Sequence, residues 1–110
     1  MNYLFKQYKI KGETYNVYLQ DIISWFDNEK SVYMIVETPA NALGYNDYIS
    51  FNNRNGNLYG ITAYRKAPPY VIRKFEKVLV KFIEDLKKGK HKNICDHFKM
   101  SAESIIERMF

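Results

Sequence analysis

Four residues near the C-terminus have side chains that could carry out chemistry: His91, Cys95, Asp96 and His97. His91 and Cys95 are four positions apart, so on a helix they would share one face. A cysteine beside a histidine can act as an activated nucleophile, and the same residue types bind zinc. However, a zinc site usually has four ligands at recognisable spacing, and the sequence contains no second such cluster. Because Cys95 also falls where a small core residue is expected, we predict that the protein is not an enzyme and uses no metal or cofactor.

Residues 93–110 share several features with a helix-turn-helix DNA-binding unit. Ser101 stands at a turn between two short apolar segments, and Cys95 lies where such units have a small residue. Other features do not fit, because Lys99 replaces the usual turn glycine and Arg108 is the only basic residue of the second helix. Cationic contacts to phosphates provide most of the affinity for DNA. We therefore predict a helical hairpin that docks on its own domain, with DNA binding as the alternative.

Positive charge is concentrated in one segment of the chain. Residues 66–92 contain nine basic and three acidic residues, whereas residues 1–65 contain six of each. The basic residues opposite the apolar side of the predicted long helix are called the basic stripe: Arg73, Lys74, Lys77, Lys81 and Lys88. This stripe is either a solvated helix face with internal ion pairs, such as Lys77 or Lys81 with Glu84 and Asp85, or a cationic surface for an acidic protein or a nucleic-acid backbone.

Tyrosine and arginine residues gather in the segment that we predict to be the third hairpin. Both types are enriched at protein–protein contacts, where they offer a large contact area with few rotatable bonds. Those that point away from the predicted core form the predicted partner-binding set: Tyr48, Arg54, Tyr59 and Arg65. Aromatic rings beside cations can also stack on bases, but no RNA-recognition signature accompanies them. We therefore expect a protein partner.

Aromatic and β-branched residues around short turns predict an antiparallel β-sheet of hairpins over about residues 2–66. The first two predicted hairpins have their strands at residues 3–10 and 14–19, and at 21–26 and 31–38. A short helix over residues 19–26 is the alternative, since periodicity does not distinguish a helix from a strand in so short an apolar run.

The third hairpin has the clearest β signal in the chain. Asn55-Gly56 supplies the two residues with positive φ that a type I′ turn requires, so this pair sets the register. In that register Gly60 lies opposite Phe51. Ile49 and Phe51 share the face that we predict to be buried, and the partner-binding set lies on the other face.

From Pro68 onward the hydrophobic period changes from 2 to 3.6 and predicts one long amphipathic helix over about residues 69–88. Its apolar side consists of Val71, Ile72, Phe75, Val78, Leu79, Phe82, Ile83 and Leu86. Gly89 is expected to end this helix. Asn93 and Ser101 are predicted to be the N-caps of two short C-terminal helices.

The length and composition are those of a small globular domain. With 110 residues, 46% hydrophobic and 26% charged, the chain is expected to form a single α+β domain over residues 1–110. It shows neither a secretory signal nor an apolar run of about 18 residues that could span a membrane. The single cysteine, Cys95, fits a reducing compartment. We therefore expect a cytoplasmic protein without membrane contact.

The expected function is binding rather than catalysis. We expect a non-enzymatic module that acts by protein–protein contact as an inhibitor or regulator of a nucleic-acid-associated partner. Nucleic acid is a second candidate partner, through the basic stripe. The alternative function is that of a small DNA-binding transcriptional regulator that uses the C-terminal unit and the basic helix. A short basic chain rich in lysine, asparagine, isoleucine and tyrosine is also typical of proteins encoded by bacterial mobile elements or phages.

Overall fold

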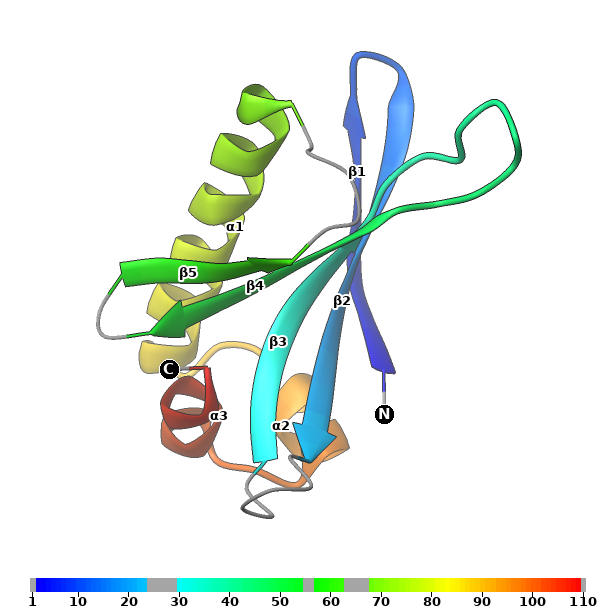
Figure 1. Cartoon of the computed structure of the whole chain (residues 1–110). Coiled ribbons are helices and arrows are strands. Elements are labelled where there is room, and N and C mark those ends of the chain that lie inside the picture. Colours follow the sequence, from blue (N-terminus) through cyan, green and yellow to red (C-terminus); the bar gives the residue numbers. More distant parts are fainter. Residues whose placement is uncertain (1, 24–29, 55–56, 63–67, 110) are drawn as a thin grey trace.

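The computed structural model in Figure 1 describes residues 2–23, 30–54, 57–62 and 68–109. The strands are β1 (Asn2–Ile10), β2 (Glu13–Ile23), β3 (Lys30–Glu37), β4 (Tyr48–Arg54) and β5 (Asn57–Thr62). They form one antiparallel sheet in the order β1-β2-β3-β4-β5. The helices are α1 (Pro69–Lys87), α2 (Lys92–Phe98) and α3 (Ala102–Arg108). The predicted α+β fold, a sheet followed by one long and two short helices, is therefore confirmed.

The second strand is longer than the sequence predicts. Residues 14–19 and 21–26 were assigned to two separate hairpins, but β2 runs without interruption from Glu13 to Ile23 and pairs with both β1 and β3. The alternative helix is therefore wrong over 19–23, and residues 24–26 lie outside the described residues. Lys11 and Gly12 join β1 to β2 with φ angles of 52° and 80°. These left-handed conformations are those that a two-residue hairpin turn requires.

The third hairpin has the predicted register only near its turn. There Asn52 lies opposite Tyr59, as predicted. Nearer the base, Ser50 pairs with Thr62, one residue beyond its predicted partner. The prediction that one register holds along the whole hairpin is therefore wrong at its base, because β5 contains one extra residue in the stretch that includes Gly60. Glycine within a strand often marks such a bulge.

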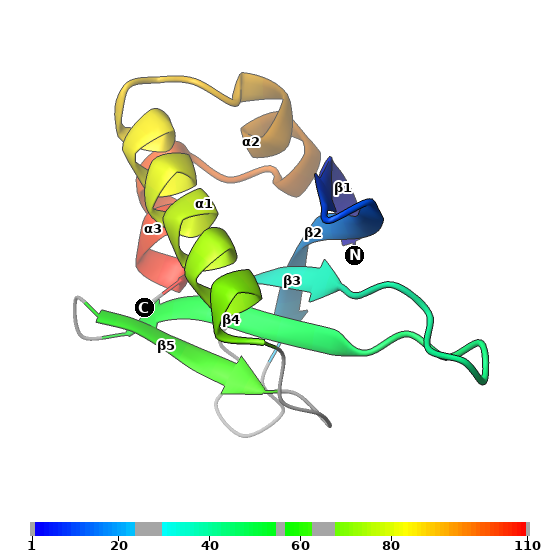
Figure 2. The same ribbon diagram turned by 90° about the horizontal axis from the view of Figure 1, so that it is seen from above.

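The helices cover one face of the sheet, and Figure 2 shows α1 lying across it. The strands contribute these buried residues to this face: Tyr15, Val17, Leu19, Val32, Met34, Val36, Ile49 and Phe51. From α1 the buried apolar residues are Val71, Phe75, Leu79, Phe82, Ile83 and Leu86. The predicted core face of β4 and the predicted apolar side of α1 are therefore confirmed. Burial of each such aliphatic or aromatic side chain contributes about 1.5–3 kcal/mol.

The ends of α1 follow from local residue types. The helix begins at Pro69, whose missing N–H would have no partner in the first turn. Gly89 follows the end of the helix with a φ of 82°, as expected for a residue at this position. The N–H of Lys90 then donates to the carbonyl of Asp85, which closes the last turn.

The two short helices pack on the core. Ile94 and Phe98 of α2 and Ile105 of α3 are buried, and this is the docking arrangement that the sequence predicts. Ser101 is the N-cap of α3, since its Oγ accepts the Ser104 N–H at 3.1 Å.

Asn93 is not an N-cap, which corrects the prediction. The N-cap of α2 is His91, two residues earlier, which has a left-handed conformation with φ 62°. The side-chain amide of Asn93 instead donates a hydrogen bond to the hydroxyl of Tyr3 on β1. This contact ties α2 to the first strand of the sheet.

Candidate functional site

The face of the sheet away from the helices, called the open face, carries aromatic and aliphatic side chains. Leu4 on β1 lies opposite Tyr18 on β2, and Tyr18 lies opposite Ile35 on β3, so the three form a row across the sheet. Leu4 is 50% exposed, whereas Tyr18, Ile35 and the nearby Tyr33 are half-buried. None of the strand residues whose burial the structure describes is buried on this face. None of the described helices therefore packs against this row.

A row of polar side chains crosses the open face beside the apolar row. The side-chain amide of Gln7 donates to Asn16 Oδ1 at 2.7 Å, and the amide of Asn16 donates to Glu37 Oε1 at 2.9 Å. The hydroxyl of Tyr48 donates to Glu37 Oε2 at 2.9 Å. This hydrogen bond, together with the negative charge of Glu37, raises the pKa of Tyr48. The polar row therefore holds the Tyr48 side chain in place at the fourth strand.

The open face is hollowed where the two rows meet. A depression of about 460 Å³ is lined by Asn2, Tyr18, Gln20, Ile35, Glu37, Tyr48 and Ser50. Aromatic, aliphatic, amide and carboxylate groups thus surround one concave area. A surface with an apolar centre and a polar rim of this kind is typical of protein–protein contacts.

The members of the predicted partner-binding set do not all lie in one described part of the structure. Tyr48 is 48% exposed and lies on the open face, as predicted. Arg54 is the last residue of β4 and Tyr59 lies within β5. Arg65 lies outside the described residues.

The residues that the structure groups with Tyr48 are ones that sequence reasoning missed: Leu4, Tyr18, Tyr33 and Ile35. The alternation along residues 14–20 could have assigned Tyr18 to the face opposite Val17. The alignment of Tyr18 with Leu4 and Ile35, however, depends on the pairing of three separate strands.

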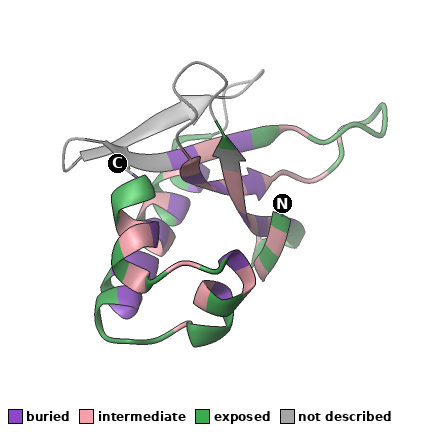
Figure 3. Cartoon of the chain, turned by 90° about the horizontal axis from the view of Figure 1, so that it is seen from below, coloured by how far each residue is buried: buried purple, intermediate pink, exposed green. Residues whose placement is uncertain are grey.

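The loop of residues 38–47, between β3 and β4, presents two further apolar side chains. It projects from the body of the molecule in Figure 3, where its tip is coloured as exposed. Asn41 Oδ1 accepts the N–H groups of Leu43 at 2.9 Å and Tyr45 at 3.1 Å. Leu43 is 78% exposed and Tyr45 is 70% exposed. The loop is thus held by its own hydrogen bonds while it exposes large apolar groups, which is common where proteins bind proteins.

The residues of the basic stripe are all exposed, on α1 and at its C-terminal cap. Lys81 Nζ lies 2.9 Å from Asp85 Oδ1, an i,i+4 pair that is one of those expected from the sequence. Within the part of the chain that the structure describes, Arg73, Lys74 and Lys77 form no ion pair. One end of the stripe is therefore partly neutralised, and the other end keeps its positive charge.

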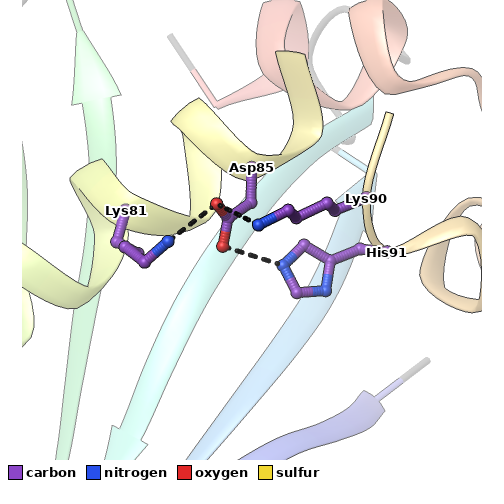
Figure 4. Close-up of polar contacts among 4 residues, drawn as sticks. All are labelled: Lys81, Asp85, Lys90 and His91. Atoms are coloured by element: carbon purple, nitrogen blue, oxygen red, sulfur yellow. Dashed lines mark hydrogen bonds and ion pairs between the residues drawn. The ribbon is translucent and has the colours of Figure 1, made fainter. Parts of the chain in front are cut away.

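Asp85 contacts both Lys81 of the basic stripe and the residues Lys90 and His91 that follow α1, as Figure 4 shows. Its side chain is largely buried, with Lys81 Nζ at 2.9 Å and Lys90 Nζ at 3.8 Å from Oδ1. His91 Nε2 lies 3.6 Å from Oδ2. The hydrogen bond from Lys81 lowers the pKa of Asp85 and raises the pKa of Lys81.

His91 and His97 pack against different aromatic neighbours. The ring of His91 lies 5.4 Å from that of Phe5 and 5.2 Å from that of Phe82, centre to centre. The ring of His97 instead lies 5.0 Å from that of Tyr3. Cys95 is half-buried and packs against the core. Among the described residues, no three His, Cys, Asp or Glu side chains are grouped so that they could hold a metal ion.

The C-terminal unit resembles a helix-turn-helix unit at its turn but not in its charge. Lys99 has a φ of 55°, the left-handed conformation that a turn glycine would adopt. However, α3 has only seven residues, and the exposed ones include Glu103, Glu107 and Arg108. The guanidinium of Arg108 also lies 3.4 Å from the carbonyl oxygen of Lys30. Two carboxylates beside one guanidinium do not favour contact with phosphates.

Comparison with protein-family models, curated proteins and solved structures finds no match to this chain. In the described part of the chain, no helix has the length and apolar character needed to span a bilayer.

Proposed function

We propose that this protein is a non-enzymatic module that binds a protein partner through the open face of its sheet. The observation that carries the proposal is the apolar row of Leu4, Tyr18 and Ile35, beside Tyr48, on a face that none of the described helices covers. Contiguous exposed apolar patches with a polar rim are uncommon on monomeric proteins unless they bind something. Tyrosine is also among the residue types that contribute most to protein–protein affinity.

A module that binds through the open face would act by covering part of its partner's surface. A module of 110 residues without chemistry of its own would act as an inhibitor or regulator. We further propose that the partner is nucleic-acid-associated and that both act in the cytoplasm, where the unpaired thiol of Cys95 would remain reduced. The depression on the open face supports a partner that inserts a side chain between Tyr18 and Tyr48.

A small DNA-binding regulator is the second candidate function, favoured by the left-handed Lys99 and the capped α3. The exposed carboxylates of α3 count against it, because they would repel phosphates. Changing Glu103 and Arg108 together distinguishes the candidates. Loss of sequence-specific DNA binding in that variant would establish the DNA-binding function and replace the one proposed here.

The first experiment is capture of the partner on the tagged full chain, from an extract treated with nuclease. The affinity of the captured partner is then measured for Leu4→Ala, Tyr48→Ala and a control, Val80→Ala. Val80 is 40% exposed on α1 and lies far from the open face in the fold. Truncation of a contact tyrosine commonly costs about 2 kcal/mol, so we expect roughly thirtyfold weaker binding for Tyr48→Ala and no change for Val80→Ala.

The melting temperature is measured alongside the affinity. Leu4 and Tyr48 are exposed, so their replacement should change stability little, and for Tyr48→Ala the loss is limited to that of its hydrogen bond to Glu37. Equal affinities for all three variants would place the partner elsewhere. Capture that disappears after nuclease treatment would show that nucleic acid, and not this surface, bridges the two proteins.

A further inference from the structure

A groove separates β1 from α1 on the helix-bearing side of the molecule, away from the open face. Its volume is about 530 Å³, and residues of β1, α1 and α2 line it. Figure 2 shows how these three elements are arranged. Tyr3, Phe5 and Tyr8 of β1 line one wall. Lysines of α1 line the other wall.

A bulge in β1 directs a further lysine into this groove. Leu4 pairs with Tyr18 on the open face, but the register shifts before Lys6, which pairs with Val17. Val17 is fully buried on the helix side, so its partner Lys6 lies on that side too. In a regular strand Lys6, two residues after Leu4, would lie on the same face as Leu4. Without the bulge, Lys6 would point to the open face.

Positive charge dominates the groove from both walls. Lys6 comes from β1, and Lys74, Lys77 and Lys81 come from α1. The carboxylate among the lining residues, Asp85, is already paired with Lys81 and Lys90. Lys6, Lys74 and Lys77 form no ion pair with any other described residue. The groove therefore offers uncompensated cations to an anionic ligand.

The lysines of α1 follow one another along the groove. Lys74, Lys77 and Lys81 are three and four residues apart, which is about 4.5 and 6 Å along a helix axis. A ligand that matches such a series carries a negative charge on each successive unit. Phosphates recur in this way along a nucleic-acid strand, whereas carboxylates recur in a peptide only where its sequence places them.

One aromatic ring of the groove, that of Tyr8, lies close to two of the cations. The ammonium groups of Lys6 and Lys74 lie 5.3 and 5.4 Å from the centre of the Tyr8 ring. Tyr3, Phe5 and Tyr8 are all half-buried, so part of each side chain remains accessible. A basic groove with aromatic side chains is the arrangement by which proteins hold single strands, because unpaired bases expose faces that can stack on rings. A duplex keeps those faces covered.

We propose that the groove between β1 and α1 binds single-stranded nucleic acid, with Lys6, Lys74, Lys77 and Lys81 against the phosphates and the rings of β1 against the bases. This site is separate from the protein-binding open face and does not depend on it. A chain with both surfaces could hold its protein partner and a nucleic-acid strand on opposite sides of one sheet.

The test uses the full chain and a fluorescein-labelled oligothymidylate of about 12 nucleotides, with binding followed by anisotropy. Contact with three or four phosphates predicts that binding weakens about 20- to 50-fold when salt rises from about 50 to 200 mM. Changing Lys74 and Lys77 together to glutamine should reduce the slope of log affinity against log salt by about 1.4. Lys6→Gln tests the opposite wall and should reduce it by about 0.7.

The matched control is Lys88→Gln with Lys92→Gln, which removes the same charge from exposed positions that do not line the groove. Circular dichroism checks that every variant is folded. An equal loss of affinity in the control variant, or equal binding of a duplex of the same length, would overturn the proposal. So would tighter binding of a glutamate-rich peptide, which would make the occupant an acidic protein segment.

Discussion

Replacing Phe75 with alanine should destabilise the fold more than almost any other single change on α1. Its side chain is fully buried, and its ring lies 5.6 Å from that of Tyr8 and 5.7 Å from that of Tyr15, centre to centre. Truncation of a buried phenylalanine to alanine costs about 3–5 kcal/mol through lost burial and the cavity that remains. Aromatic pairs contribute about 0.5–1.5 kcal/mol beyond their buried area, so we expect the upper half of that range.

That loss is a large part of the stability of a domain of this size, which is roughly 5–15 kcal/mol. Urea unfolding should therefore show a midpoint far below that of the unmodified protein, with an unchanged slope if unfolding remains two-state. Val80→Ala on the same helix is the control, because Val80 is 40% exposed and its change should cost less than about 0.5 kcal/mol. A cost below about 1 kcal/mol for Phe75→Ala would mean that the apolar side of α1 does not form the core.

Two further predictions concern single backbone and side-chain features. Lys99→Gly should stabilise the protein by about 1 kcal/mol, because Lys99 adopts a left-handed conformation that glycine adopts without strain. Lys77→Gly, in the interior of α1, should destabilise the protein by a similar amount. Thermal unfolding of both variants checks that the two effects have opposite signs. The pKa of Tyr48 is raised above 10.0 by Glu37, so the stabilisation from their hydrogen bond is fully present below pH 10 and is lost as pH rises through the folded-state pKa. Absorbance titration of the protein against a Tyr48→Phe variant measures that pKa, and Glu37→Gln should lower it; an unchanged titration after that substitution would contradict the assignment.

Features that repeat along one segment could be predicted from the sequence. The apolar side of α1 recurs with the helical period over about four turns, so local pattern alone fixes which residues are buried, from Val71 to Leu86. Ile49 and Phe51 were predicted to face the core because they alternate with polar residues beside a recognisable turn. Ser101 could be predicted as an N-cap because a capping hydroxyl accepts a hydrogen bond from a backbone N–H only three residues along the chain.

Features that depend on pairing between strands could not be predicted in the same way. An extra residue in a strand reverses the faces of all residues beyond it, and nothing near Phe5 indicates that β1 bulges there. The position of Lys6 in the groove was missed for this reason. The apolar row on the open face was missed because its residues come from separate strands, and because its exposure depends on the described helices packing on the other side of the sheet.

The most direct test of binding through the open face is site-specific photo-crosslinking to the captured partner. A photoreactive phenylalanine analogue is placed at Tyr33, on the open face of β3, and in a separate protein at Tyr70, which is 39% exposed at the start of α1. We predict that the partner crosslinks to position 33 and not to position 70. Crosslinking from position 70 alone would show that the partner binds the helix side, and it would contradict the proposed function of the open face.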